Sequence, residues 1–200
     1  MARIKHTKTE LKRQRDALRR FERYLPTLQL KKQQLQMEVR NVETRRKEKA
    51  EEDKQARSDL DPWVKLFSEP FPLEDYLQLV RVEESVANIA GVNIPVLEKA
   101  VFNRQEPDLF ATPPWIDAGL RVLEQLIRLR LEHIFLKVAH ERLLAELRTT
   151  TQRVNLFEKV KIPEARENIR TIRIFLGDQQ TAEVARGKIA KGKAPAESLR

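Results

Sequence analysis

The chain has 200 residues with 39 Lys and Arg against 30 Asp and Glu, which gives a formal net charge of +9. It contains no cysteine, which excludes disulfide bonds and thiolate metal sites and predicts a reducing compartment. Residues 1–23 are basic and lack the apolar core of a signal peptide. Because no apolar run approaches the roughly 18 residues that span a membrane, we also expect no transmembrane helix.

The charge falls into three segments. Residues 1–60 hold 18 basic and 10 acidic residues, residues 61–115 hold 4 and 9, and residues 116–200 hold 17 and 11. The middle segment also contains 7 of the 10 prolines and 7 of the 12 aromatic residues. Because proline ends helices and aromatic residues build small cores, this distribution predicts two long helical flanks around a compact insert.

Residues 1–60 predict an N-terminal coiled-coil helix. When Leu11 is placed at position a of a heptad, apolar residues occupy 4 of 6 a positions and 4 of 6 d positions up to Lys49. A repeat of this length is typical of a coiled-coil seam. Pro26 leaves the heptad in phase, so it predicts a kink within one helix. The seam residues predicted for this flank are Leu11, Leu18, Phe21, Leu25, Leu28 and Leu35.

Residues 113–178 predict a second, C-terminal coiled-coil helix, capped by Thr112 and ending near Gly177. Apolar residues recur there mostly at spacings of three and four, as on one face of a helix. The seam residues predicted for this flank are Ile127, Ile134, Val138, Ile169, Ile172 and Leu176. Two such helices in one chain most simply pair antiparallel. The predicted fold is therefore mainly α, a long antiparallel two-helix coiled coil with a small central insert.

The insert, residues 61–112, contains one readable pattern. Apolar and polar residues alternate over residues 80–86 and 92–96, which predicts a short β-hairpin at about residues 79–97 with Gly91 near its turn. A brief helix is expected before it, at residues 72–80. Residues 179–200 are rich in Ala, Lys and Gly, and we expect them to form a basic, flexible tail.

The sequence lacks the motifs of catalysis. It has no phosphate-binding glycine loop and no hydrolase or zinc-protease motif. His133 and His140 share a helix face but lie roughly 10 Å apart along it, too far to bind one metal ion. We therefore predict no catalytic, cofactor-binding or metal-binding residues and no cofactor. Basic clusters such as Arg19-Arg20 fit either a nucleic-acid contact or a solvated helix surface.

Three stretches carry a resemblance to a known family. Residues 7–12 and 28–35 are similar to an opening helix with a Leu-rich seam and a Lys-rich end. Residues 88–95 have the pattern Asn-x-x-Gly-Val-x-x-Pro, and residues 153–163 have the pattern Arg-Val-Asn-x-x-Glu-x-x-x-Ile-Pro. In this order, and over about a third of the chain, they resemble the D subunit of V-type and archaeal A-type ATPases. The last stretch is the most specific.

The resemblance implies a central-stalk rotor subunit that is itself not an enzyme. Such a subunit couples ATP hydrolysis or synthesis in a catalytic head to rotation and to H⁺ or Na⁺ transport through a membrane ring. Its implied partners are the A and B subunits of the head, a small F subunit and the cap of the ring. It would lie on the cytoplasmic face of the membrane, with no nucleotide, nucleic acid or membrane insertion of its own. The alternative is a basic coiled-coil protein associated with nucleic acid or the ribosome.

Two regions supply the candidate partner contacts. The first is the motif at residues 153–163, for which plain helix packing is the alternative explanation. The second is the hairpin, which resembles a regulatory or docking feature. The candidates are Arg153, Asn155, Glu158, Ile162, Pro163, Val86, Gly91, Val92 and Pro95.

Overall fold

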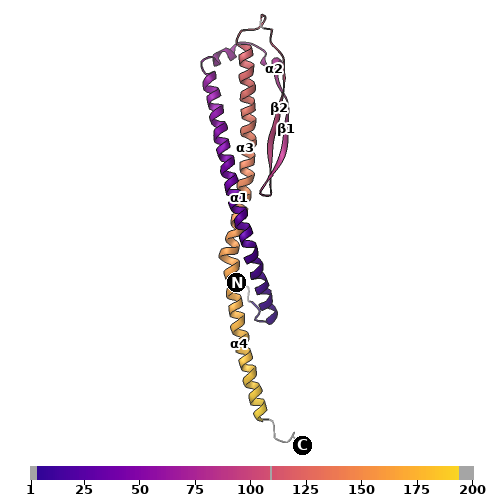
Figure 1. The fold of residues 1–200 in the computed structure, drawn as a ribbon, viewed down its shortest axis with the longest axis vertical. Helices are drawn as coiled ribbons and strands as arrows, with labels where there is room; N and C mark the ends of the chain where they lie inside the picture. The colour runs from indigo at the N-terminus through magenta and orange to yellow at the C-terminus, as the bar shows by residue number, and fades with distance from the viewer. Residues whose placement is uncertain (1–3, 109, 194–200) are drawn as a thin grey trace. The chain divides into compact units, whose positions relative to one another are not determined.

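The structure is a computed structural model that describes residues 4–108 and 110–193. Along the chain, a β-hairpin lies between long helical segments (Figure 1). This arrangement confirms the predicted fold class. In chain order the elements are α1 (Lys8–Leu60), the 3₁₀-helix η1 (Val64–Ser68), α2 (Leu73–Tyr76), β1 (Leu77–Ile89), β2 (Val92–Arg104), α3 (Ile116–Leu156), the π-helix η2 (Phe157–Lys161) and α4 (Ile162–Lys193).

The chain divides into two compact units. The terminal unit comprises Met1–Leu30 and Thr150–Arg200, and the central unit comprises Lys31–Thr149. Helices α1 and α3 each contribute residues to both units.

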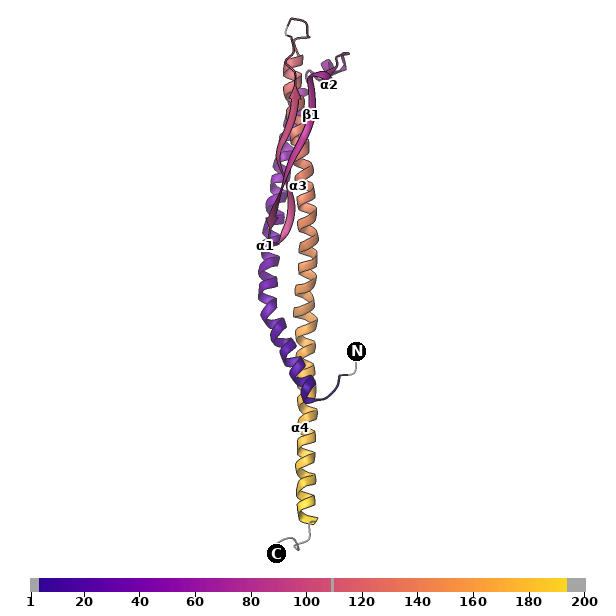
Figure 2. The ribbon, with the colours of Figure 1, turned by 90° about the vertical axis from the view of Figure 1, so that its right-hand side faces the viewer.

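In the terminal unit, the first part of α1 lies beside η2 and α4 and runs antiparallel to them (Figure 2). The ring centroids of Phe21 and Phe157 are 5.2 Å apart, and those of His6 and Phe175 are 4.8 Å apart. Earlier residues of one segment therefore meet later residues of the other. The buried residues of this unit recur mostly every three or four positions and are Thr150, Val154, Ile162, Ala165, Ile169 and Ile172.

The predicted seam residues of the terminal unit lie along this pairing. Ile169 and Ile172 are buried. The others are half-buried: Leu11, Leu18, Phe21, Leu25, Leu28 and Leu176. Two paired helices cover each seam side chain from one side only, which explains why so few side chains here are fully enclosed.

A π-helical turn precedes Pro163. Proline has no N–H and its ring clashes with the carbonyl four residues earlier, here that of Lys159. The helix widens at this point into η2, and the backbone N–H of Ile162 donates to the carbonyl oxygen of Phe157. Such insertions accommodate local misfit in an otherwise regular helix, so the chain stays helical from α3 into α4.

Pro26 lies inside α1, and the helix continues through it. The in-phase heptad predicted this continuity. Packing of the flanking seam residues Leu25 and Leu28 compensates for the hydrogen bond that proline removes.

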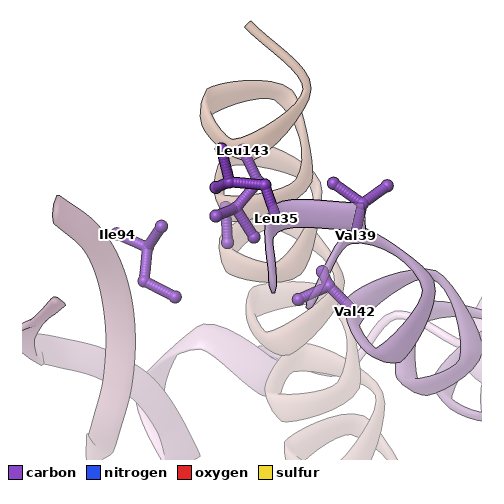
Figure 3. Packing of buried hydrophobic residues seen from close by; sticks show 6 residues of the cluster. Leu35, Val39, Val42, Ile94 and Leu143 are labelled. Carbon is purple, nitrogen blue, oxygen red and sulfur yellow. The ribbon is translucent and has the colours of Figure 1, made fainter. Parts of the chain in front are cut away.

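The core of the central unit joins α1, α3 and the hairpin. Leu35, Val39 and Val42 of α1 contact Ala139 and Leu143 of α3, and Ile94 of β2 closes the cluster from the side (Figure 3). Leu35 and Leu143 are fully buried. Three elements rather than two surround these side chains, so burial is more complete here than in the terminal unit.

A second cluster anchors the base of the hairpin. Leu77 of β1 packs with Ile116 and Leu120 of α3. Aromatic residues of the insert surround it, with the rings of Phe67 and Trp115 at 5.1 Å and those of Phe71 and Tyr76 at 5.1 Å. The Pro- and aromatic-rich insert thus forms a small core of its own against the start of α3.

The hairpin is longer than the predicted residues 79–97, because its strands pair from Leu77 with Arg104 to Ile89 with Val92. Ala90 and Gly91 form the two-residue turn with φ values of 50° and 80°. This left-handed conformation suits a tight hairpin and favours glycine. The Gly91 N–H donates to the Asn88 side-chain oxygen at 3.1 Å, which supports the turn.

The start of α3 differs from the sequence-based expectation. The helix begins at Ile116 rather than at Pro113. Thr112 does not cap it, because the helix starts four residues further on; its hydroxyl donates to the carbonyl oxygen of Asp108 at 2.7 Å. The short helix expected at residues 72–80 is confined to α2, and β1 already begins at Leu77.

The seam of α3 is shifted from the predicted positions. Ile134 is exposed and Val138 only half-buried, while Ala139 and Leu143 face α1. Ile127 packs instead against the base of the hairpin. The prediction erred because alanine gives a weak apolar signal and because α3 has two apolar partners, so its apolar residues do not form one stripe.

The C-terminal helix also runs further than expected. Helix α4 passes through Gly177 and continues to Lys193, so Gly177 does not end it. An interior glycine costs only about 1 kcal/mol relative to alanine, and the surrounding Ala, Glu, Gln, Lys and Arg residues favour helix. Of the predicted tail, residues 194–200 lie outside the described residues.

Candidate functional site

A groove lined by arginines follows one side of the helix pair in the terminal unit. We call it the basic groove, and it has a volume of about 800 Å³. Helix α1 supplies its first four lining residues and α4 the remainder. They are Arg15, Leu18, Arg19, Glu22, Arg166, Ile169, Arg170, Arg173 and Ile174.

A second groove follows the other side of the same seam. We call it the mixed groove, and it has a volume of about 390 Å³. Its lining residues are Glu10, Arg13, Gln14, Ala17, Arg20, Phe21, Lys161, Glu164, Ala165 and Asn168. At 3.6 residues per turn, the α1 residues of the two grooves lie on opposite flanks of the stripe formed by Leu18 and Phe21.

The two grooves differ in charge. Five arginines and one glutamate give the basic groove a net charge of +4. Three cations and two carboxylates give the mixed groove a net charge of +1. The helix pair therefore presents electrostatically different faces, and a symmetric helix surface would not.

The single carboxylate of the basic groove is already paired. Arg166 Nη2 donates to Glu22 Oε1 at 2.8 Å, and this ion pair also joins α4 to α1. Arg170 lies 3.9 Å from Glu167. Among the described residues, Arg15, Arg19 and Arg173 form no ion pair. Most of the positive charge of the groove is therefore available to an external anion.

The motif at residues 153–163 divides into buried and exposed positions. Val154 and Ile162 are buried in the terminal unit. Arg153, Asn155, Glu158 and Pro163 are exposed. The side chain of Ile162 is packed in the interior and is not available for a partner contact. The four exposed side chains are available.

The hairpin candidates also separate by exposure. Val86 and Gly91 are exposed, whereas Val92 and Pro95 are half-buried. Val92 packs against the core around Leu35 and Ile94. The outward face of the hairpin, with Val86 at 68% exposure, is thus the part open to a partner.

Polar contacts fix the helices and the hairpin of the central unit in register. Lys31 Nζ donates to Glu146 at 2.6 Å, and Lys49 Nζ lies 3.1 Å from Glu132. Arg142 donates to the backbone carbonyl oxygen of Asn93 at 3.1 Å, which ties the hairpin tip to α3. These contacts lie at the rim of the apolar core, where they set alignment more than stability.

The ion pairs of Lys49 persist at neutral pH. Hydrogen bonds to Glu52 and then to Glu132 raise the pKa of the Lys49 ammonium group above its usual value. A raised folded-state pKa gives stability that is present below the unfolded pKa and is lost as the pH rises through the folded one. The Lys49 ammonium group therefore loses its charge, and with it this contribution, only in strongly alkaline solution.

Within residues 4–108 and 110–193, no three His, Asp or Glu side chains gather closely enough to hold a metal ion. None of the helices in these ranges contains a stretch that is both long and apolar enough to cross a membrane. The described residues offer three candidate surfaces: the basic groove, the exposed residues of the 153–163 motif and the outer face of the hairpin.

Comparison with known proteins places this chain in a class of rotary-ATPase components. Residues 10–192 match the family described as the ATP synthase D subunit. The chain is 49% identical over 191 residues to the V-type ATP synthase D subunit of Borreliella burgdorferi. This match covers 96% of this chain and 95% of the relative. It is 36% identical over 196 residues to the protein of the same name from Chlamydia trachomatis, with 95% of each chain covered. The chain belongs to the ATP synthase D subunit family, which confirms the resemblance found in the sequence.

Proposed function

We propose that this chain is the central-stalk rotor subunit of a V-type ATPase or ATP synthase. In this role it couples ATP hydrolysis or synthesis in the catalytic head to rotation and to transport of H⁺ or Na⁺ through the membrane ring. The observation that carries the proposal is membership of the D subunit family over nearly the whole chain. The chain itself catalyses no reaction and needs no cofactor. It lies at the cytoplasmic face of the membrane as a peripheral part of the complex.

The shape of the charge distribution supports this role. A rotor transmits rotation only if its interaction free energy with the head differs between the states of the head. The helix pair of the terminal unit has one groove of charge +4 and one of charge +1. A partner surface that meets first one groove and then the other therefore experiences different interactions, which is what coupling requires.

The proposed partners are the A and B subunits of the head, the small F subunit and the cap of the membrane ring. The terminal unit meets the head. The exposed motif residues Arg153, Asn155, Glu158 and Pro163 meet the head or the F subunit. The outer face of the hairpin offers a further docking surface in the central unit.

Affinity purification with a tag on the full chain tests the proposal. We expect two large ATPase subunits and a small F-like subunit to co-purify, and we expect the isolated chain to hydrolyse no ATP. Recovery of RNA or DNA without ATPase subunits, with a steep dependence of binding on salt, would instead support the nucleic-acid-associated alternative.

A substitution on the outer face of the hairpin tests its docking role. Val86→Asp is expected to change the ATPase rate of the assembled complex by roughly two- to fivefold, since one exposed interface contact contributes on the order of 1 kcal/mol. The melting temperature of the isolated chain should stay unchanged because Val86 is 68% exposed. ATPase assays of complexes reconstituted with each variant provide the measurement.

Val80→Asp is the matched control for this experiment. Val80 lies on the same strand, nearer the base of the hairpin, and is 65% exposed. If docking involves the half of the hairpin nearer the turn, where Val86 lies, the ATPase rate of this variant stays close to wild type. No effect of either substitution would remove the outer face of the hairpin from the partner contacts, and equal effects would show that the contact is not confined to the half nearer the turn.

A further inference from the structure

The basic groove combines two rows of guanidinium groups with an apolar floor. Arg15 and Arg19 lie one turn apart on α1, and Arg166, Arg170 and Arg173 follow at successive turns of α4. Leu18 and Ile169 lie between the rows on the seam side, and Ile174 lies beyond the arginine row of α4. Leu18 is half-buried and Ile174, at the rim, is 57% exposed, so the groove leaves apolar surface uncovered as well as positive charge unpaired.

This combination specifies the chemistry of an occupant. Arginine side chains bind carboxylates through charge-assisted hydrogen bonds, and the exposed apolar floor favours apolar side chains of the same ligand. A helix whose apolar residues recur at three or four positions, flanked on each side by Asp or Glu, offers both. Its carboxylates repeat at the same helical spacing as the arginines on α1 and α4.

We propose that the basic groove docks an acidic amphipathic helix of a partner protein, with carboxylates on both sides of a short apolar stripe. The proposal deepens the rotor function and rests on it, because the partner is then a component of the same complex. None of the nine lining residues is aromatic, so the groove lacks the stacking surfaces that single-stranded nucleic acid uses. An acidic helix therefore fits the groove better than a polynucleotide.

The mixed groove does not fit the same occupant. Glu10 and Glu164 lie among its cations and would repel the carboxylates of an acidic helix. The proposal thus assigns different roles to two neighbouring arginines of α1. Arg19 lines the basic groove and Arg20 lines the mixed groove. Substitution of Arg20 is therefore a control for substitution of Arg19, because it removes the same residue type and charge from the other groove.

Paired charge removal tests the proposal in the complete complex. Arg19→Gln with Arg173→Gln is expected to weaken assembly with the catalytic subunits at least roughly tenfold at about 0.1 M salt. Arg13→Gln with Arg20→Gln removes the same charge from the mixed groove and is expected to weaken it far less. All four residues are exposed, and equal melting temperatures of the isolated chains exclude a folding defect. The difference between the two variants should shrink at high salt because long-range charge interactions are screened.

The possible outcomes distinguish a failure of the groove assignment from a failure of the proposed function. If the wild-type chain fails to assemble with ATPase subunits, the rotor function is wrong and the groove assignment falls with it. If the wild type assembles and both double variants assemble alike, the function stands and the groove assignment is overturned. A fluorescent single strand of about 20 nucleotides tests the polynucleotide alternative. If it binds the wild type and its binding is lost only in the Arg19→Gln, Arg173→Gln variant, the occupant is a polynucleotide and the acidic helix is wrong.

Zero-length crosslinking identifies the occupant directly. Arg19→Lys with Arg173→Lys keeps the charge and supplies amines that a carbodiimide joins to neighbouring carboxylates. We expect both lysines in the assembled complex to link to Asp or Glu residues of one partner helix, on the two sides of its apolar stripe. Crosslinks no more frequent than those of the Arg20→Lys control, or spread over unrelated segments, would overturn the assignment.

Discussion

Replacing Leu35 with alanine is expected to lower the free energy of unfolding by about 2–5 kcal/mol, the range found for truncating buried leucines. Leu35 is fully buried where α1, α3 and β2 meet, in contact with the cluster that includes Leu143 and Ile94. Truncation removes apolar contacts and leaves a cavity that three separate elements would have to close together. Denaturant unfolding of the isolated chain, followed by circular dichroism, measures the change.

Met37→Ala is the control for this prediction. Met37 lies two residues away on α1 and is 60% exposed, so its truncation should change the free energy of unfolding by no more than about 0.5 kcal/mol. A Leu35→Ala variant as stable as Met37→Ala would show that the cluster around Leu35 does not support the central unit.

The helices could be predicted from the sequence because their pattern is local. The seven-residue repeat places Leu35, Val39 and Val42 on one face of α1, and all three are buried. The interior face of α3 could not be predicted in the same way. Ala139 is buried there but carries too little apolar surface to mark a stripe, and the hairpin draws Ile127 to a different face. A repeat identifies a helix reliably, but it identifies the face that packs against a partner only when the helix has a single partner.

The candidate surfaces were predictable only in part for a related reason. The sequence marks Arg19-Arg20 as a basic pair but gives the two residues the same meaning. Their separation into different grooves depends on which α4 residues lie opposite, and Arg173 is more than 150 positions away in the chain. Only the register of the antiparallel pairing brings these residues together, and heptad spacing alone does not fix that register. The motif at residues 153–163 was found by resemblance, and its exposed side chains became evident only from the structure.

Ile172→Asp is expected to separate the helices of the terminal unit while leaving the central unit folded. Ile172 is fully buried on α4, and an unpaired carboxylate at such a position costs about 3–5 kcal/mol in addition to the lost apolar contacts. The terminal unit has mostly half-buried seam residues and so has little stability in reserve. Hydrogen exchange should therefore show faster exchange in residues 8–30 and 150–192, with residues 31–149 still protected, because compact units open separately.

The same variant tests whether the terminal unit transmits rotation. If the paired helices carry torque, complexes with Ile172→Asp should lose ATP-driven ion transport to a much greater extent than ATP hydrolysis, because a separated helix pair no longer presents its two differently charged grooves in a fixed orientation. Thr171→Asp places the same charge on an adjacent, exposed position and should preserve both activities. Ion transport measured in reconstituted vesicles alongside ATP hydrolysis distinguishes the cases. Normal transport by a complex whose terminal unit exchanges rapidly would show that the paired state of these helices is not needed for coupling.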